Sequence, residues 1–165
     1  MNGSFVPSLL HDSLTPSTHP ERVVEVFLAA LARPDTATAA TLLDDRVVWT
    51  NVGLPSIRGK RAVLKVLRGM GEGGPVSFEV YLHAIAANGS TVLTERTDVI
   101  VLGRLRLQFW VSGRFDVRDG RITLWRDSFD FIDVTRAMLR GLAGVALPFL
   151  RPRAPVSAKT PPGRH

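Results

Sequence analysis

The feature that most constrains the fold of this chain is a run of four β-rich segments after Gly74, with no helical pattern between them. Hairpin turn signals separate these segments, at Asn88-Gly89, Gly103 and Asp119-Gly120. Strands joined by such short turns pair antiparallel with their neighbours. The predicted strands are Val76–Ala87, Thr91–Leu102, Arg104–Val117 and Arg121–Phe131.

Helical patterns lie on both sides of this run, where apolar residues recur at spacings of three and four. The order of elements predicts an α+β fold, in which a curved, mostly antiparallel sheet wraps around helices and encloses an apolar pocket in a cone. Asp35 and Asp133 are expected to cap the second and the last helix. The predicted helices are Glu21–Arg33, Thr36–Leu43, Gly59–Met70 and Asp133–Leu150, with a further strand at Val47–Val52.

The 165 residues are enough for one compact domain and too few for two of ordinary size. Seven of the 11 prolines lie in residues 1–20 and 151–165, which are also rich in Ser, Thr and Gly. We therefore expect a flexible N-terminal arm at 1–20, one folded domain at 21–150, and a flexible basic tail at 151–165.

The composition excludes several kinds of function. The chain has 0 Cys, which removes disulfides, thiolate nucleophiles and Cys-based zinc sites. Among its 4 His only His83 belongs to the predicted domain, and no metal-ligand spacing is present, so no metal is expected. The net charge of +6 comes mainly from residues 151–165, so the domain lacks the dense basic face that binds nucleic acid.

No segment predicts secretion or insertion into a membrane. Residues 1–20 lack both the basic and the apolar region of a signal peptide. The longest strongly apolar stretch, Gly141–Leu150, is about half as long as a membrane span. We therefore expect a cytoplasmic protein.

Charged residues occupy positions that strand alternation assigns to the buried face. Alternate residues of a strand point to the same side, so every second residue from 121 to 131, Asp127 among them, is expected on one face. The same rule sets Arg96 and Asp98 in an apolar row of another strand. Three strands are thus expected to bring Asn51, Arg96, Asp98 and Asp127 to one apolar surface.

The charges of this group point to acid–base chemistry. A buried charge is costly unless it is paired, and one guanidinium between two carboxylates meets that demand. The three groups together would carry a net charge of −1, so one carboxylate is expected to be protonated, which gives an acid and a base. The alternative is a structural ion pair that holds the sheet together.

Apolar residues of the same strands and of the flanking helices are expected to form the core and, where the sheet surrounds a cavity, to line it. The residues predicted to contact a hydrophobic substrate are Leu31, Leu67, Met70, Ile100, Leu107, Phe109, Val111, Trp125, Phe129, Phe131, Met138 and Leu142.

Three short segments resemble one enzyme family. They are Trp49-Thr50-Asn51, Thr94-Glu95-Arg96-Thr97-Asp98 and Trp125-Arg126-Asp127-Ser128-Phe129-Asp130. At these residues, and more loosely from Glu21 to Asp133, the chain resembles the limonene-1,2-epoxide hydrolase family. It is most similar to the actinobacterial branch proposed to act on bulky lipid or sterol epoxides. The resemblance implies the cone-shaped fold of nuclear transport factor 2, SnoaL and ketosteroid isomerase.

The resemblance also implies one-step hydrolysis of an epoxide to a vicinal diol, without a covalent intermediate and without a metal or organic cofactor. Asp127 would take a proton from a water molecule that Asn51 orients. Asp98, kept protonated, would donate to the epoxide oxygen, and Arg96 would bridge the two carboxyl groups. Trp49 stands where the family has a tyrosine that contacts the water. The expected partners are a small hydrophobic epoxide, water and a second copy of the chain in a homodimer.

Two other functions are compatible with the same residues. An isomerase or cyclase of this fold would use Asp127 to remove a carbon-bound proton. A non-catalytic lipid-binding module would use the oily helix at 138–150, with weak contact to an anionic membrane through it and the basic tail. The arginines flanking this helix are Arg136, Arg140, Arg151 and Arg153. For the helix itself, we favour a cover over the pocket or a subunit interface.

Overall fold

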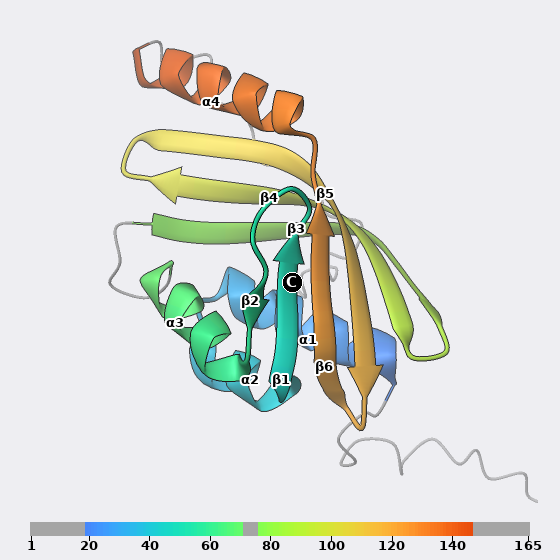
Figure 1. The fold of residues 1–165 in the computed structure, drawn as a ribbon. Coiled ribbons are helices and arrows are strands. Elements are labelled where there is room, and N and C mark those ends of the chain that lie inside the picture. Colours follow the sequence, from blue (N-terminus) through green and yellow to red (C-terminus); the bar gives the residue numbers. More distant parts are fainter. Residues whose placement is uncertain (1–18, 71–75, 147–165) are drawn as a thin grey trace, which may run out of the picture.

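The computed structural model describes residues 19–70 and 76–146, which form a sheet with four helices (Figure 1). This arrangement confirms the predicted α+β class. The elements are α1 (Pro20–Ala32), α2 (Thr36–Leu42), β1 (Leu43–Asn51), β2 (Ile57–Arg58), α3 (Lys60–Gly69), β3 (Val76–Asn88), β4 (Thr91–Leu102), β5 (Leu105–Arg118), β6 (Arg121–Ser128) and α4 (Phe131–Ala146).

The six strands form one sheet in the order β2-β1-β6-β5-β4-β3. Neighbouring strands pair antiparallel except β1 and β6, which run parallel. Register shifts interrupt the pairing between Leu82 and Ala84 and between Asp116 and Val117. Such bulges bend strands. Figure 1 shows β5 crossing the upper part of the molecule before it turns downward, with β4 running beside it in the opposite direction.

Three helices supply the core on one face of this sheet. The apolar stripe of α1 packs with residues of α2 and α3 against the central strands. Phe27 of α1 is fully buried and contacts Phe115 of β5 and Trp125 of β6 with its ring. The last helix, α4, packs against β5 and lies at the end of the molecule away from α2 and α3 (Figure 1). In the two described ranges, no helix is long and apolar enough to cross a membrane.

Several predicted boundaries differ from those of the structure. The second helix ends at Leu42, and the strand expected from Val47 begins at Leu43; the short strand β2 was not expected. The strand expected to reach Phe131 ends at Ser128, and α4 begins at Phe131. The backbone N–H of Ile132 donates to Asp130 Oδ1 at 2.8 Å, so Asp130, and not Asp133, receives the first free N–H of this helix.

A bulge also corrects the face assigned to the start of β6. The sequence pattern put residues 121 and 123 on the buried face, but Ile122 is fully buried while Arg121 is exposed. The shift between Asp116 and Val117 inserts one extra residue in β6 and so reverses the alternation before Leu124.

Residues 1–18 and 147–165 lie outside the described ranges. They contain most of the predicted N-terminal arm, the whole predicted tail and the predicted end of the last helix. Pro20, which was predicted to belong to the arm, is part of α1.

Candidate active site

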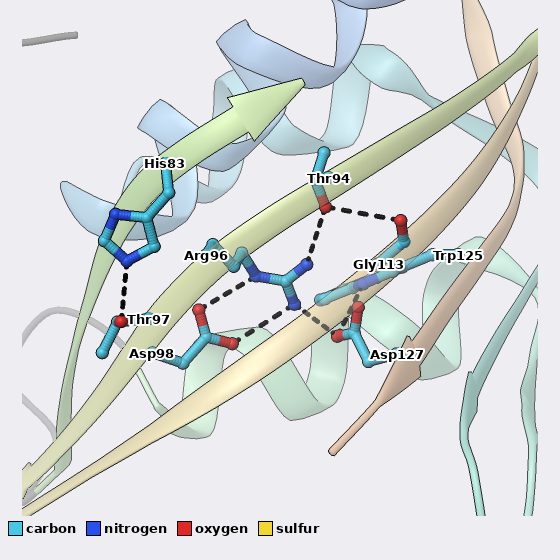
Figure 2. A network of polar contacts seen from close by, with 8 residues as sticks. All are labelled: His83, Thr94, Arg96, Thr97, Asp98, Gly113, Trp125 and Asp127. Carbon is cyan, nitrogen blue, oxygen red and sulfur yellow. Dashed lines mark hydrogen bonds and ion pairs between the residues drawn. The ribbon is translucent and has the colours of Figure 1, made fainter. Parts of the chain in front are cut away.

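Arg96 lies at the centre of a buried polar cluster, with 1% of its surface exposed (Figure 2). Its Nε donates to Asp98 Oδ1 at 2.9 Å, and its Nη2 donates to Asp98 Oδ2 at 3.2 Å. The same Nη2 lies 2.7 Å from Asp127 Oδ2, and Nη1 donates to Thr94 Oγ1 at 3.3 Å. One guanidinium therefore joins two carboxyl groups that belong to different strands.

Strand register explains how these residues meet. Thr94, Arg96 and Asp98 alternate along β4 and so point to one side of the sheet. Gly113 of β5 pairs with Thr94 on one side and with Asp127 of β6 on the other. The guanidinium reaches Asp127 across β5 at the position where that strand has no side chain.

Gly113 is a functional position that the sequence analysis missed. A Cβ atom on this residue would collide with Arg96 Nη1 and with Thr94 Oγ1. The signal was present, because a glycine inside a strand often marks the close approach of another group. It could not be interpreted without knowing which residue lies on the neighbouring strand.

Burial and the neighbouring charges act on the protonation of Asp98 and Arg96. Burial raises the pKa of Asp98, and although Arg96 opposes this effect, the pKa of Asp98 stays above its ordinary value, with a further contribution from the negative charge of Asp127. Burial alone would lower the pKa of Arg96, but the charges of Asp127 and Asp98 outweigh it, so the guanidinium remains charged. The cluster can hold a neutral acid beside a carboxylate.

The two oxygens of Asp127 have different surroundings. Oδ2 contacts Arg96 Nη2 at 2.7 Å and accepts a hydrogen bond from Trp125 Nε1 at 2.8 Å. Oδ1 is buried and has no hydrogen-bond partner among the described residues. A buried acceptor without a partner is unfavourable in a folded protein, so this oxygen is the place where the site can receive a water or substrate hydrogen.

Asn51 and Trp49 lie next to the cluster on β1. In the parallel pairing of β1 with β6, Asn51 faces Asp127 and Trp49 faces Trp125, so each pair shares a side of the sheet. The Trp49 ring stacks on Trp125 with centroids 4.3 Å apart. Its Nε1 is buried and has no partner in the part of the chain that the structure describes.

The predicted apolar lining divides into groups. Leu31, Leu67 and Met70 line a pocket together with Phe78. Phe78 pairs with Ile100, which pairs with Leu107, and the adjacent row contains Asp98 and Phe109. Asp98 does not line this pocket; it lies one row of the sheet away from Phe78, which does.

The other predicted lining residues have other environments. Val111 and Trp125 are almost fully buried, as are Asp98 and Asp127. The Phe129 ring contacts both Phe109 and Phe131. The side chains of the α4 residues among them are about half exposed: Phe131, Met138 and Leu142.

Other candidate groups lie outside the cluster. Thr97 alternates with Arg96 and so points to the opposite side of β4, where its Oγ1 lies 2.8 Å from His83 Nε2 (Figure 2). Tyr81 pairs with Thr97, and its hydroxyl donates to Glu79 at 2.7 Å. Within residues 19–70 and 76–146, no group of three or more His, Asp or Glu side chains is arranged to hold a metal ion.

The α+β fold with one curved sheet and the Asp–Arg–Asp cluster buried in it together define a class of proteins. The model of the limonene-1,2-epoxide hydrolase catalytic domain matches residues 18–140. Epoxide hydrolase EphG of Mycobacterium tuberculosis is 51% identical over 128 residues, which cover 78% of this chain and 85% of that protein. The chain belongs to the limonene-1,2-epoxide hydrolase family.

Solved structures agree with this assignment. An epoxide hydrolase of M. tuberculosis, described as similar to the limonene-1,2-epoxide hydrolases, superposes with a TM-score of 0.75 at 50% identity, over 78% of this chain and 96% of that one. A protein with a ketosteroid isomerase-like fold from Catenulispora acidiphila gives a TM-score of 0.62 at 12% identity, over 70% of this chain and 91% of that one. The second similarity shows the fold alone.

Substitution of Gly113 tests whether Arg96 needs the gap in β5. We expect Gly113→Ala to displace the guanidinium, to lower the free energy of unfolding by about 1–3 kcal/mol, and to abolish turnover, because overpacking forces neighbours out of position. Chemical denaturation and steady-state kinetics measure the two effects. Gly69→Ala is the matched control, because a Cβ at Gly69 meets no atom within 4 Å. An active, stable Gly113→Ala variant would contradict this account of the site.

Proposed function

We propose that this chain, an epoxide hydrolase by its family, adds water to a hydrophobic epoxide in one step and releases a vicinal diol. The observation that carries the proposal is the pair of carboxyl groups on one guanidinium, one with its pKa raised by burial and the other with a free buried oxygen. General acid–base catalysis needs a proton donor and a proton acceptor that act on the same substrate.

In the proposed reaction, Asp127 Oδ1 accepts a proton from a water molecule, whose oxygen attacks one epoxide carbon. The carbon–oxygen bond of the ring breaks, and the neutral Asp98 donates its proton to the leaving oxygen. Asn51 is placed to orient the water, because it lies beside Asp127 on the parallel neighbouring strand. A net transfer of one proton from Asp127 to Asp98 restores the starting state, and no metal or organic cofactor takes part.

The apolar surface beside Asp98 supports a hydrophobic substrate. It passes from Phe109 through Ile100 and Leu107 to the pocket around Leu67 and Met70. Binding sites for small molecules are mostly apolar, with a few polar groups that fix orientation. A bulky terpene-, lipid- or sterol-like epoxide would bury its skeleton here and present its ring to Asp98.

No observation favours the isomerase or the binding module over hydrolysis. The phenol that an isomerase would use for an enolate is absent from the cluster, because the single tyrosine, Tyr81, donates to Glu79 on the other side of the sheet. On α4, the side chains of Leu139 and Met138 are exposed. Membrane contact through this helix stays a prediction, as do the homodimer and the cytoplasmic location.

Labelled water tests the proposed reaction. The protein in excess over a racemic lipophilic epoxide, in heavy-oxygen water, should give labelled diol in the first turnover, because water attacks the ring directly. Unlabelled diol in that turnover would indicate a covalent carboxylate ester, and altered double bonds would indicate isomerisation. Unchanged epoxide retained by the protein would indicate binding only.

Asp127→Asn tests the proposed base. We expect roughly a 10²-fold or larger loss of kcat with little change in ligand affinity, because the amide keeps the shape but cannot take the proton. Steady-state kinetics and equilibrium binding of the diol product measure the two effects. Asp119→Asn is the control: Asp119 lies in a turn with φ of 49°, a conformation that asparagine tolerates. Activity of Asp127→Asn within a few-fold of the original protein would remove Asp127 from the mechanism.

The pH dependence tests Asp98 as the proposed acid. Burial raises its pKa, and the active form is the protonated one. The rate should therefore fall as the pH rises through the raised pKa of Asp98. A profile of kcat from mildly acidic to alkaline pH measures this, with circular dichroism to verify the fold. A flat profile with the fold intact would contradict the assignment.

Trp49→Tyr tests the residue at the family's tyrosine position. An indole offers one N–H and no acceptor, whereas a phenol can both donate to and accept from water. We expect a higher kcat on small epoxides and a higher KM for large ones, an effect of about one hydrogen bond, or ~1 kcal/mol and a few-fold in rate. Kinetics on one small and one sterol-sized epoxide measure it. Slower turnover of both would show that the indole itself belongs to the water site.

A further inference from the structure

The orientation of Asp127 is fixed by two donors that converge on one of its oxygens. Arg96 Nη2 lies 2.7 Å and Trp125 Nε1 lies 2.8 Å from Oδ2, whereas Oδ1 has no partner among the described residues. Figure 2 shows both contacts, one from the guanidinium of Arg96 and one from the indole of Trp125, meeting at the carboxyl group of Asp127. Because 4% of Asp127 is exposed, this asymmetry is not masked by bulk solvent.

Arg96 alone is a weak constraint on this carboxyl group. Nη2 of Arg96 contacts Asp127 and also donates to Asp98 Oδ2. The two N–H groups of this nitrogen are therefore divided between the two carboxyl groups. The terminal torsion of an aspartate is broad, and a carboxylate held by one donor can rotate about it. A second donor from another direction fixes the plane of the group.

The indole of Trp125 is well suited to that task, because it is buried and packed against other rings. It is 2% exposed and stacks on Trp49 with centroids 4.3 Å apart and an interplanar angle of 8°. The Phe27 ring contacts it edge-on at 5.1 Å, and the Phe115 ring lies 6.3 Å away at 15°. Three aromatic neighbours thus hold the N–H in one place.

We propose that Trp125 is a positioning residue, whose indole N–H occupies Oδ2 of Asp127 and leaves Oδ1 as the oxygen that takes the proton from water. The proposal rests on the proposed role of Asp127 as the base. It gives Trp125, which is 2% exposed, a role besides the predicted contact with substrate, and that contact stays a prediction.

Kinetics of Trp125→Phe test the proposal. The phenylalanine keeps an aromatic ring and removes the N–H, so we expect kcat to fall roughly 10-fold or more, as for a lost hydrogen bond to a charged group, with KM unchanged. Trp110→Phe is the matched control, because Trp110 pairs with Thr97 on the opposite side of the sheet and is half exposed. An unchanged kcat, or a change in KM alone, would overturn the proposal.

A second variant removes the N–H without changing the shape of the ring. Benzothienylalanine at position 125 replaces the N–H by sulfur, so it keeps the proposal testable if Trp125→Phe does not fold. The same loss of kcat is expected, and full activity would overturn the proposal. Asp127→Asn separates the two hypotheses: if that variant is active, the proposed base is wrong, whereas if it is inactive and the position 125 variants are fully active, only the role of Trp125 is wrong.

Nuclear magnetic resonance observes the hydrogen bond directly. The 3 tryptophans give three indole N–H signals, which Trp→Phe variants assign. We expect the Trp125 signal to lie downfield of the other two and to move upfield in Asp127→Asn, because a neutral amide oxygen is a weaker acceptor than a carboxylate. A Trp125 signal that Asp127→Asn leaves in place would overturn the proposal.

Discussion

The buried guanidinium of Arg96 is the group on which the rest of the site depends. A charge taken out of water costs several kcal/mol, and the interior recovers this only when opposite charges and hydrogen-bond partners are well placed. Asp98, Asp127 and Thr94 supply these partners from two strands. Two carboxylates exceed what one guanidinium neutralises, so we propose that one of them is protonated. On this proposal, the contacts that allow the cluster to be buried also divide it into an acid and a base.

The sheet is built to accommodate this cluster. Arg96 reaches across β5 because Gly113 has no side chain in the way. Gly113 pairs with Thr94 on one side and with Asp127 on the other, and this pairing sets the distance from β4 to Asp127 that the arginine side chain has to span. A change of register by one residue would turn Asp127 to the other face and leave the guanidinium with Asp98 as its remaining carboxyl partner. The electrostatic requirement and the strand pairing thus favour the same register.

The sequence predicted the members of the cluster because strand alternation is a local property. A period of two assigns Arg96, Asp98 and Asp127 to buried faces without any knowledge of which strands are neighbours. The role of Gly113 and the parallel pairing that puts Asn51 beside Asp127 depend on lateral neighbours, which one strand does not encode. The face of Ile122 was assigned wrongly for a related reason, since a bulge changes the period at a place that the pattern does not mark.

Two adjacent rows of the sheet bear on the proposed preference for a hydrophobic epoxide. One row is polar and pairs Asn51 with Asp127, and the next is aromatic and pairs Trp49 with Trp125. The aromatic row is buried, and the only indole N–H engaged in a described hydrogen bond points from it to Asp127. Charges beside buried rings interact more strongly than they would in water. On the proposed mechanism, a water molecule beside these rows meets two buried polar atoms without a described partner, Asp127 Oδ1 and Trp49 Nε1, and only the first can accept its proton.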